Sequence, residues 1–233
     1  MTAFQYHQAI VERFPTIVGG VILADGLTNG ETPAELREIY SNEQETVKQR
    51  IGTTPLSQIP ALVAWRRAFR AFDVDPTQYR SAAEALLRRL TKKGDIPTIN
   101  TLVDLGNLVS IRYALPVAVF DTRLLSGAVT VRFASGDEQY TTLGQSDEDP
   151  PKPGEVIFVD DAGMVIARRW CWRQSEPSAA QMDTTNAIIT IEGHHAEARR
   201  DIEAALQDLQ TLLHAYARGT YKTGIVDKDN LRI

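Results

Sequence analysis

Residues 99–121 read INTLVDLGNLVSIRYALPVAVFD, and the first part of this stretch has the periodicity of an amphipathic helix. Apolar residues recur at steps of three and four, which predicts a helix from Thr101 to Tyr113. The stripe consists of Leu102, Leu105, Leu108, Val109 and Tyr113. The helix is expected to end at Leu115-Pro116, because a residue before proline avoids helical backbone angles.

A second informative stretch, TTNAIITIEGHH, occupies residues 184–195. Its apolar run predicts a buried strand that ends near Glu192. Burying a carboxylate is costly without a partner, so Glu192 is either a pocket residue or a surface residue at the strand end. His194 and His195 follow. One imidazole could meet Glu192 and act as a base, or both could be exposed at a helix N-terminus.

The N-terminal half is predicted to be mostly helical. Residues 3–13 form a candidate helix that ends before Pro15. Residues 17–27 contain a glycine pair among β-branched residues, which predicts a buried strand with a close backbone approach. Residues 32–35, Thr-Pro-Ala-Glu, are typical of a capping box that opens a charged helix reaching about Arg50.

Two further helices are expected before the central stretch. Residues 59–72 place Trp65 on an apolar helical face, which favours a core position over ligand binding. Ser81 and Glu84 form a second capping box. The helix that they open is expected to end at residues 92–94, Lys-Lys-Gly.

After residue 128 the pattern changes to period two. Residues 129–133 alternate as in a half-buried strand, and EVIFVD, MVIA and AIITI predict three more strands. An acidic, proline-rich loop at 146–155 and a helix at about 196–217 complete the pattern, with no docking assigned to residues 221–233. We therefore expect an α+β fold, in which N-terminal and C-terminal helices pack on a mixed, mostly antiparallel sheet in the second half of a single domain, 1–233.

Composition excludes several classes of protein. The single cysteine, Cys171, excludes an internal disulfide and fits a reducing cytoplasm. Neither a signal peptide nor a membrane span is expected, because no apolar block is long enough. Metal-ligand spacing and nucleotide-binding glycine loops are absent, so we expect no metal and no cofactor. The net charge of −5 argues against a nucleic-acid-binding protein dominated by phosphate contacts, and no DNA partner is expected.

The order and spacing of these motifs resemble the editing domain of the beta subunit of bacterial phenylalanyl-tRNA synthetase, the B-three/B-four tRNA-binding domain. The family carries the run I-N-N-V-V-D-V-T-N-Y-V, and L-x-x-P-x-x-x-F-D follows it. The matching residues here are Ile99, Asn100, Val103, Asp104, Asn107, Val109, Pro116, Phe120 and Asp121. Residues 130–145 and 154–167 resemble two strand pairs of that family, and the similar region is 80–195. ATP-site and anticodon motifs do not occur here, so the resemblance implies a free-standing editing-type domain.

The resemblance implies that Glu192 lies in the editing pocket, where the family's glutamate recognises the tyrosine hydroxyl of a mischarged tRNA. This match requires one inserted residue. The sequence departs from the family at residues 168–175, RRWCWRQS, which replace a glycine-rich loop, and at Ala118, which replaces a histidine. The T-D-A-S segment that follows the family's last strand is also missing, so tyrosine is not assigned as the substrate.

Arginines that alternate with tryptophans in RRWCWRQS can stack on a base and pair with a phosphate. In the alternative, the tryptophans pack in the core and the arginines face solvent. Asp104 and Asn107, one helical turn apart, are pocket candidates, with capping or buried hydrogen bonding as the alternative. The candidate substrate-binding residues are Glu192, Asn107, Asp104, Arg168, Trp170, Trp172 and Arg173, and the candidate RNA-binding residues are Arg168, Arg169, Arg173, Lys92 and Lys93. No catalytic residue is assigned.

The expected function is binding of the aminoacyl end of tRNA and hydrolysis of a mischarged aminoacyl ester. Such an ester is labile, so backbone groups and ribose hydroxyls suffice to place a water. The alternatives are a non-catalytic RNA-binding module and a protein that binds a free amino acid. The sequence determines neither the amino acid nor the oligomeric state.

Overall fold

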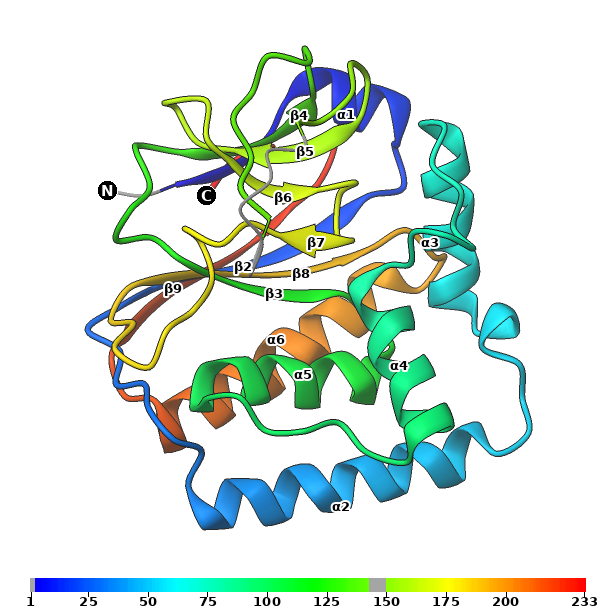
Figure 1. The fold of residues 1–233 in the computed structure, drawn as a ribbon, viewed down its shortest axis with the longest axis vertical. Helices are drawn as coiled ribbons and strands as arrows, with labels where there is room; N and C mark the ends of the chain where they lie inside the picture. Colours follow the sequence, from blue (N-terminus) through cyan, green and yellow to red (C-terminus); the bar gives the residue numbers. More distant parts are fainter. Residues whose placement is uncertain (1–2, 143–149) are drawn as a thin grey trace.

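The computed structural model describes residues 3–142 and 150–233, which form two stacked β-sheets with helices beneath them (Figure 1). One sheet has the order β1 (Phe4–Tyr6), β4 (Val129–Phe133), β5 (Val156–Val159), β6 (Val165–Arg168) and β7 (Arg173–Gln174). The other has the order β3 (Val117–Asp121), β8 (Ala187–Gly193), β2 (Val18–Asp25) and β9 (Thr220–Val226). All pairs are antiparallel except β1 with β4. The predicted α+β class, with mostly antiparallel strands, is confirmed.

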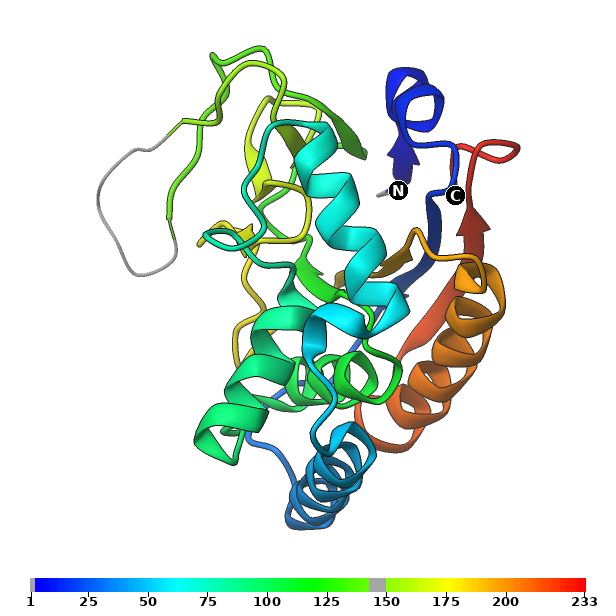
Figure 2. The same ribbon diagram turned by 90° about the vertical axis from the view of Figure 1, so that its right-hand side faces the viewer.

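The helices lie mainly on one side of the four-stranded sheet. They are α1 (Gln8–Arg13), α2 (Ala34–Ile51), α3 (Pro60–Ala71), α4 (Ala82–Lys93), α5 (Thr101–Tyr113) and α6 (Ala198–Tyr216), with a 3₁₀ turn, η1 (Leu56–Gln58). Helices α5 and α6 pack directly on this sheet, and α2 lies beyond α5 (Figures 1 and 2). The predicted helices at 59–72, 101–113 and 196–217 are confirmed to within about two residues.

Strand β8 divides the core, because its side chains alternate between the two faces of the sheet. Ile189 and Ile191 belong to the cluster between the sheet and the helices. Ile188 belongs to the cluster between the two sheets. By the same alternation Thr190 and Glu192 face the five-stranded sheet. A polar site therefore lies between two apolar layers.

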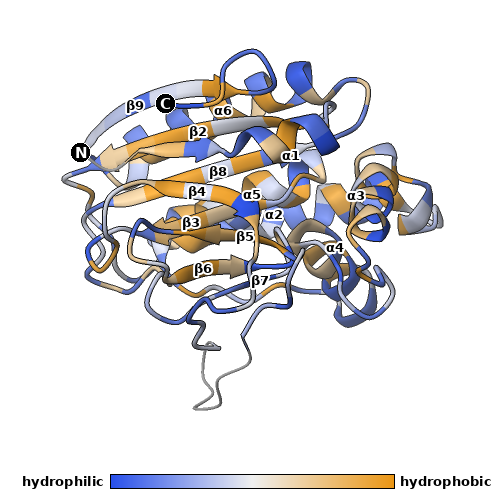
Figure 3. Ribbon diagram, turned by 90° about the horizontal axis from the view of Figure 1, so that it is seen from above, coloured by the Kyte–Doolittle hydropathy of each residue, from blue (hydrophilic) through white to orange (hydrophobic). Residues whose placement is uncertain are grey.

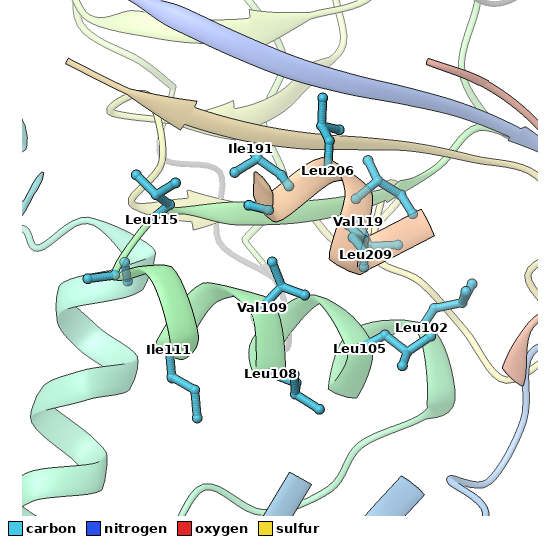
Figure 4. Close-up of a cluster of buried hydrophobic side chains, with 14 of the residues drawn as sticks. Leu102, Leu105, Leu108, Val109, Ile111, Leu115, Val119, Ile191, Leu206 and Leu209 are labelled. Carbon is cyan, nitrogen blue, oxygen red and sulfur yellow. The ribbon is translucent and has the colours of Figure 1, made fainter. Parts of the chain in front are cut away.

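The central helix, α5, shows why the 99–121 stretch is so apolar. Val109 points toward Val119 and Ile191 of the sheet, whereas Leu108 and Ile111 point to the opposite side of the helix (Figure 4). Both sides of α5 are thus covered. Strands β3, β4, β5, β6 and β8 are likewise predominantly hydrophobic, whereas the edge strand β9 is not (Figure 3).

Both chain ends pair with strands in ways that the sequence did not predict. The single helix expected over residues 3–13 is wrong, since Phe4–Tyr6 is a strand beside β4 and only Gln8–Arg13 is helical. The Tyr6 N–H donates to the carbonyl of Leu231, 2.9 Å away, which ties the two ends of the chain together. Residues 220–226 form β9 on the edge of β2. The sheet is therefore not confined to the second half of the chain.

Helix caps follow the sequence in one of two places. The Ser81 hydroxyl accepts a hydrogen bond from the Glu84 N–H at 3.4 Å, and Gly94 ends the same helix in a left-handed conformation. The capping box predicted at Thr32 is wrong. Pro33 takes the N-cap position, and the Thr32 hydroxyl instead donates to Asp104 at 2.5 Å. The Thr32 hydroxyl thus bonds to the buried Asp104 carboxylate and does not cap α2.

Gly20 makes the close approach of α6 to β2 possible. A Cβ on Gly20 would lie 2.7 Å from Ile202 Cγ2 and 2.8 Å from Leu206 Cδ1. Gly20→Ala should therefore lower the free energy of unfolding by about 1–3 kcal/mol through overpacking. Urea denaturation measures this. The matched control is Gly30→Ala, whose Cβ would have no atom within 4 Å; equal denaturation midpoints for the two variants would contradict the packing argument.

Candidate functional site

A cavity of about 150 Å³ lies between the two sheets and next to α5. Its apolar wall includes Ala118, Phe120, Phe158 and Ala167, and its polar lining includes Asn107, Cys171, Trp172, Arg173, Gln174, Thr190 and Glu192. An apolar cavity of about 150 Å³ holds one benzene-sized group. Of the candidate site residues, this cavity is lined by Glu192, Asn107, Trp170, Trp172 and Arg173, and not by Asp104, Arg168 or Arg169.

Three side chains hold Glu192 in place, two through its carboxylate and one through its backbone. Its Oε1 accepts hydrogen bonds from the Tyr6 hydroxyl at 2.6 Å and from Trp170 Nε1 at 3.0 Å. Trp65 Nε1 donates to the Glu192 backbone carbonyl at 3.4 Å. Within the part of the chain that the structure describes, no group donates to Oε2, and Glu192 lines the cavity. One carboxylate oxygen therefore positions the group and the other is available to a ligand.

Burial dominates the chemistry of this carboxyl. Glu192 is only 2% exposed, and burial raises its pKa to about 7 although the hydrogen bonds from Trp170 and Tyr6 act in the opposite direction. Near neutral pH both the protonated and the ionised form of this carboxyl are therefore populated. It can therefore either donate a hydrogen bond to a ligand or accept one.

Gly19 makes room for the Tyr6 side chain. It pairs with Glu192 across β2 and β8, and a Cβ on Gly19 would overlap the Tyr6 hydroxyl. Sequence analysis missed Tyr6, because its contact with Glu192 spans 186 residues. The glycine pair was the available signal: it predicted a close approach without identifying what approaches.

The loop after β6 directs Trp170 inward. Arg169 and Trp170 have positive φ angles of 44° and 62°, an unusual conformation for side-chain-bearing residues. The turn is held by the Arg169 N–H, which donates to Glu155 Oε1 at 3.0 Å, and by the Trp170 N–H, which donates to the Val156 carbonyl at 2.7 Å. Trp170 is fully buried, and its ring is edge-on to Trp65 at 5.3 Å. It is therefore a core residue that also orients Glu192.

Two of the three loop arginines lie in the protein interior. Arg168 forms a two-point ion pair with Glu155, in which both N–O distances are 2.9 Å, and is 0% exposed. Arg169 is 7% exposed, and its guanidinium lies over Tyr79 at 3.9 Å and over Trp172 at 4.4 Å. The alternative of solvent-facing arginines is wrong for this pair. Burial also keeps both guanidinium groups away from a surface phosphate.

The rim of the cavity keeps an exposed cation and a half-buried ring. Arg173 is exposed, and its guanidinium lies over the Trp172 ring at 4.6 Å. Both residues line the cavity. Lys92 and Lys93 are exposed at the C-terminal end of α4 and do not line it. Trp172 and Arg173 thus lie at the cavity rim, whereas Lys92 and Lys93 lie on a separate surface.

Asp104 lies outside the cavity. It is fully buried and accepts hydrogen bonds from the Thr32 hydroxyl at 2.5 Å and from the Ile99 N–H at 2.9 Å. Burial raises its pKa. The alternative of buried hydrogen bonding describes this residue, because one oxygen joins α5 to Thr32, before α2, and the other bonds the backbone of Ile99, just before α5. Asn107, one turn later, does line the cavity.

The two histidines are neither exposed nor bonded to Glu192. The His194 ring packs against Trp65 at 4.6 Å and Trp170 at 5.0 Å, and burial lowers its pKa to about 3. It is therefore neutral at physiological pH. His195 Nε2 lies 2.9 Å from an Asp201 carboxylate oxygen. Both predictions for the two histidines, that their rings are exposed and that one is a base beside Glu192, are wrong.

Within residues 3–142 and 150–233, no group of three or more His, Cys, Asp or Glu side chains has a metal-binding arrangement. Likewise, none of the helices described is both long enough and apolar enough to cross a membrane.

Comparison with known proteins identifies the family. The family model named B3/4 domain matches residues 64–227. The chain belongs to the B3/4 domain family. Curated relatives include phenylalanine–tRNA ligase beta subunits from Geobacter metallireducens, 28% identical over 163 residues, and from Fusobacterium nucleatum, 40% identical over 63 residues. These matches cover 61% and 27% of this chain, respectively, but only 20% and 8% of those subunits.

Among solved structures, an N-terminal fragment of the phenylalanyl-tRNA synthetase beta subunit from Pyrococcus horikoshii aligns with 100% of this chain and 53% of that fragment. The TM-score is 0.49 and the sequence identity is 13%. The B3/4 domain here thus spans a minor part of the length of the curated ligase subunits that it matches.

Glu192→Gln should make stability less dependent on pH. Because the folded pKa of Glu192 is raised to about 7, its contribution to stability is fully present below about pH 4.5 and is lost as pH rises through 7. Glutamine does not titrate, so the variant should gain up to about 3 kcal/mol relative to wild type between pH 5 and pH 8. Urea denaturation of both proteins across this range measures the difference. A constant difference would contradict a raised pKa.

Tyr6→Phe should raise the pKa of Glu192 above its wild-type value, because the lost hydroxyl donates to the ionised carboxylate. NMR titration of the glutamate carboxyl carbons measures the change. Tyr113→Phe is the matched control, since the Tyr113 hydroxyl donates to Asp208 instead. A Glu192 pKa that falls or stays constant in Tyr6→Phe would show that this hydrogen bond does not stabilise the anion.

Proposed function

We propose that this B3/4 domain binds the aminoacyl end of a tRNA and hydrolyses a mismatched aminoacyl ester. The observation that carries the proposal is the cavity of about 150 Å³ with the Glu192 carboxyl in its wall. Its volume suits one amino-acid side chain, and its rim carries Trp172 and Arg173. The ligase names of the relatives support tRNA as the carrier.

Glu192 is proposed to recognise the side chain. Its Oε2 takes the hydrogen bond of a hydroxyl or amine, while Oε1 stays bonded to Tyr6 and Trp170. A side chain without a polar end would leave Oε2 of this carboxyl unpaired, which costs about 1–3 kcal/mol. The site therefore discriminates against purely apolar side chains of the same size.

Hydrolysis needs a placed water more than a strong nucleophile. The water oxygen attacks the ester carbonyl, the bond from the carbonyl carbon to the ribose oxygen breaks, and the ribose oxygen takes up a proton. Thr190 and Asn107 supply the hydroxyl and amide groups of the cavity lining that can orient this water and the carbonyl. At the rim, Arg173 supplies a cation for the terminal phosphate and Trp172 a ring near the terminal base.

A second candidate is capture of a free amino acid. The burial of Arg168 and Arg169 favours it, because it removes two loop cations from the surface. A thermal shift with free amino acids, but none with tRNA, would establish this function instead.

The test is deacylation of a panel of mischarged tRNAs. Wild type should hydrolyse esters whose side chain carries a hydrogen-bonding group. Glu192→Gln should lower kcat/KM for those esters by about 5- to 150-fold relative to apolar ones, if Glu192 recognises the side chain. An equal loss on all esters would assign water activation to Glu192 instead.

The matched control for this panel is Glu197→Gln, a nearby exposed glutamate. It should leave every rate unchanged. If wild type hydrolyses none of the esters in the panel, the enzyme function is excluded.

A further inference from the structure

A second concave surface lies beside α4, where α4 faces α3 and η1. It encloses about 400 Å³ and is lined by four cations and one carboxylate: Arg66, Arg80, Arg88, Lys92 and Glu84. Serine and threonine hydroxyls fill out its polar lining. We call this surface the α4 groove. Its excess of positive charge contrasts with the net charge of −5 of the whole chain.

The charges of the α4 groove form a row. Glu84, Arg88 and Lys92 are spaced four residues apart, so they lie on one face of α4 at intervals of about 6 Å. Glu84 is already paired with Arg66 at 2.5 Å and lies 3.9 Å from Arg80. Arg88 and Lys92 are exposed, and neither forms an ion pair with any residue that the structure describes. Two cations are thus available to an external anion.

The α4 groove and the cavity lie on opposite sides of the first turn of α4. Ala82 lines the cavity, and Glu84, two residues later and so about half a turn around the helix, lines the groove. An aromatic pair connects the two sides, because the Tyr79 ring lies 5.0 Å from the Trp172 ring at the cavity rim. Arg80 follows Tyr79 and lines the groove. A polymer whose end enters the cavity can therefore continue past these rings into the groove.

We propose that the α4 groove binds the backbone phosphates of the RNA strand whose aminoacyl end enters the cavity. This inference rests on the proposed function. Arg88 and Lys92 contact successive phosphates, the hydroxyls donate further hydrogen bonds, and the bases nearest the end lie against Trp172 and Tyr79. Phosphate contacts carry no sequence information, so the groove supplies affinity while the cavity selects the amino acid.

The test compares two double variants that lower the charge of the protein equally. Arg88→Gln with Lys92→Gln removes the unpaired cations of the groove. The control, Lys222→Gln with Arg232→Gln, removes two exposed cations at β9 and the C-terminus, which line a different hollow. Binding of deacylated tRNA is measured by fluorescence anisotropy over a series of salt concentrations.

The groove variant should bind tRNA about tenfold more weakly near 0.1 M salt, and its log–log salt slope should fall by roughly 1.4–2. The control should stay within about twofold of wild type. Equal affinity and slope for the two variants would overturn the inference, and so would failure of wild type to bind tRNA.

A minimal substrate separates the groove from the cavity. An aminoacyl ester of adenosine has the reacting bond but no backbone phosphates, so the groove variant should hydrolyse it with wild-type kcat/KM. A loss on this ester would show that Arg88 and Lys92 act through the cavity, which would overturn the inference. If wild type hydrolyses no ester while the groove variant still weakens tRNA binding, the inference stands and the proposed hydrolysis fails.

Discussion

The buried carboxylate of Glu192 is the point at which separate parts of the fold meet. It lies on β8 of the four-stranded sheet, but Tyr6 comes from β1 of the other sheet and Trp170 from the loop after β6. Trp65 of α3 closes the arrangement by donating to the Glu192 backbone. A buried carboxyl without donors is strongly unfavourable, so the two sheets and α3 must pack together for Glu192 to be tolerated.

Two other buried carboxylates follow the same rule. Glu155 holds Arg168 in a buried ion pair and accepts the Arg169 N–H, which stabilises the left-handed turn that places Trp170. Asp104 satisfies Thr32 and the backbone of Ile99. In both cases each carboxylate oxygen accepts at least one hydrogen bond. Glu192 differs because only one of its oxygens is used and it lines the cavity.

The loop after β6 determines how much space the site offers. The segment that it resembles is rich in glycine, which occupies little volume. Here Trp170 fills the space beneath Glu192 and Trp172 stands at the rim, so the remaining cavity has only about 150 Å³. Ala118 lines the same cavity where the family motif has a histidine. The sequence therefore departs from the family motif at positions that line the cavity.

The sequence by itself predicted the local features of the protein. Periodicity located α3, α5 and α6, cap residues located both ends of α4, and the motifs near residues 99–121 and 184–195 indicated the family. It also selected Glu192, through the resemblance to the family motif and because burying a carboxylate at the end of an apolar strand is costly without a partner. These features depend on residues that are close together in the chain.

The tertiary structure alone decided which side chains surround that glutamate. Tyr6 is 186 positions away, and the β1 strand that carries it forms only because β4 and the C-terminal residues pair with it. Tertiary partners also decide whether Arg168 faces solvent or Glu155. They decide likewise whether Asp104 lines a pocket or joins two segments. A sequence shows which side chains can ionise; their burial and partners, which determine what they do, are properties of the packed chain.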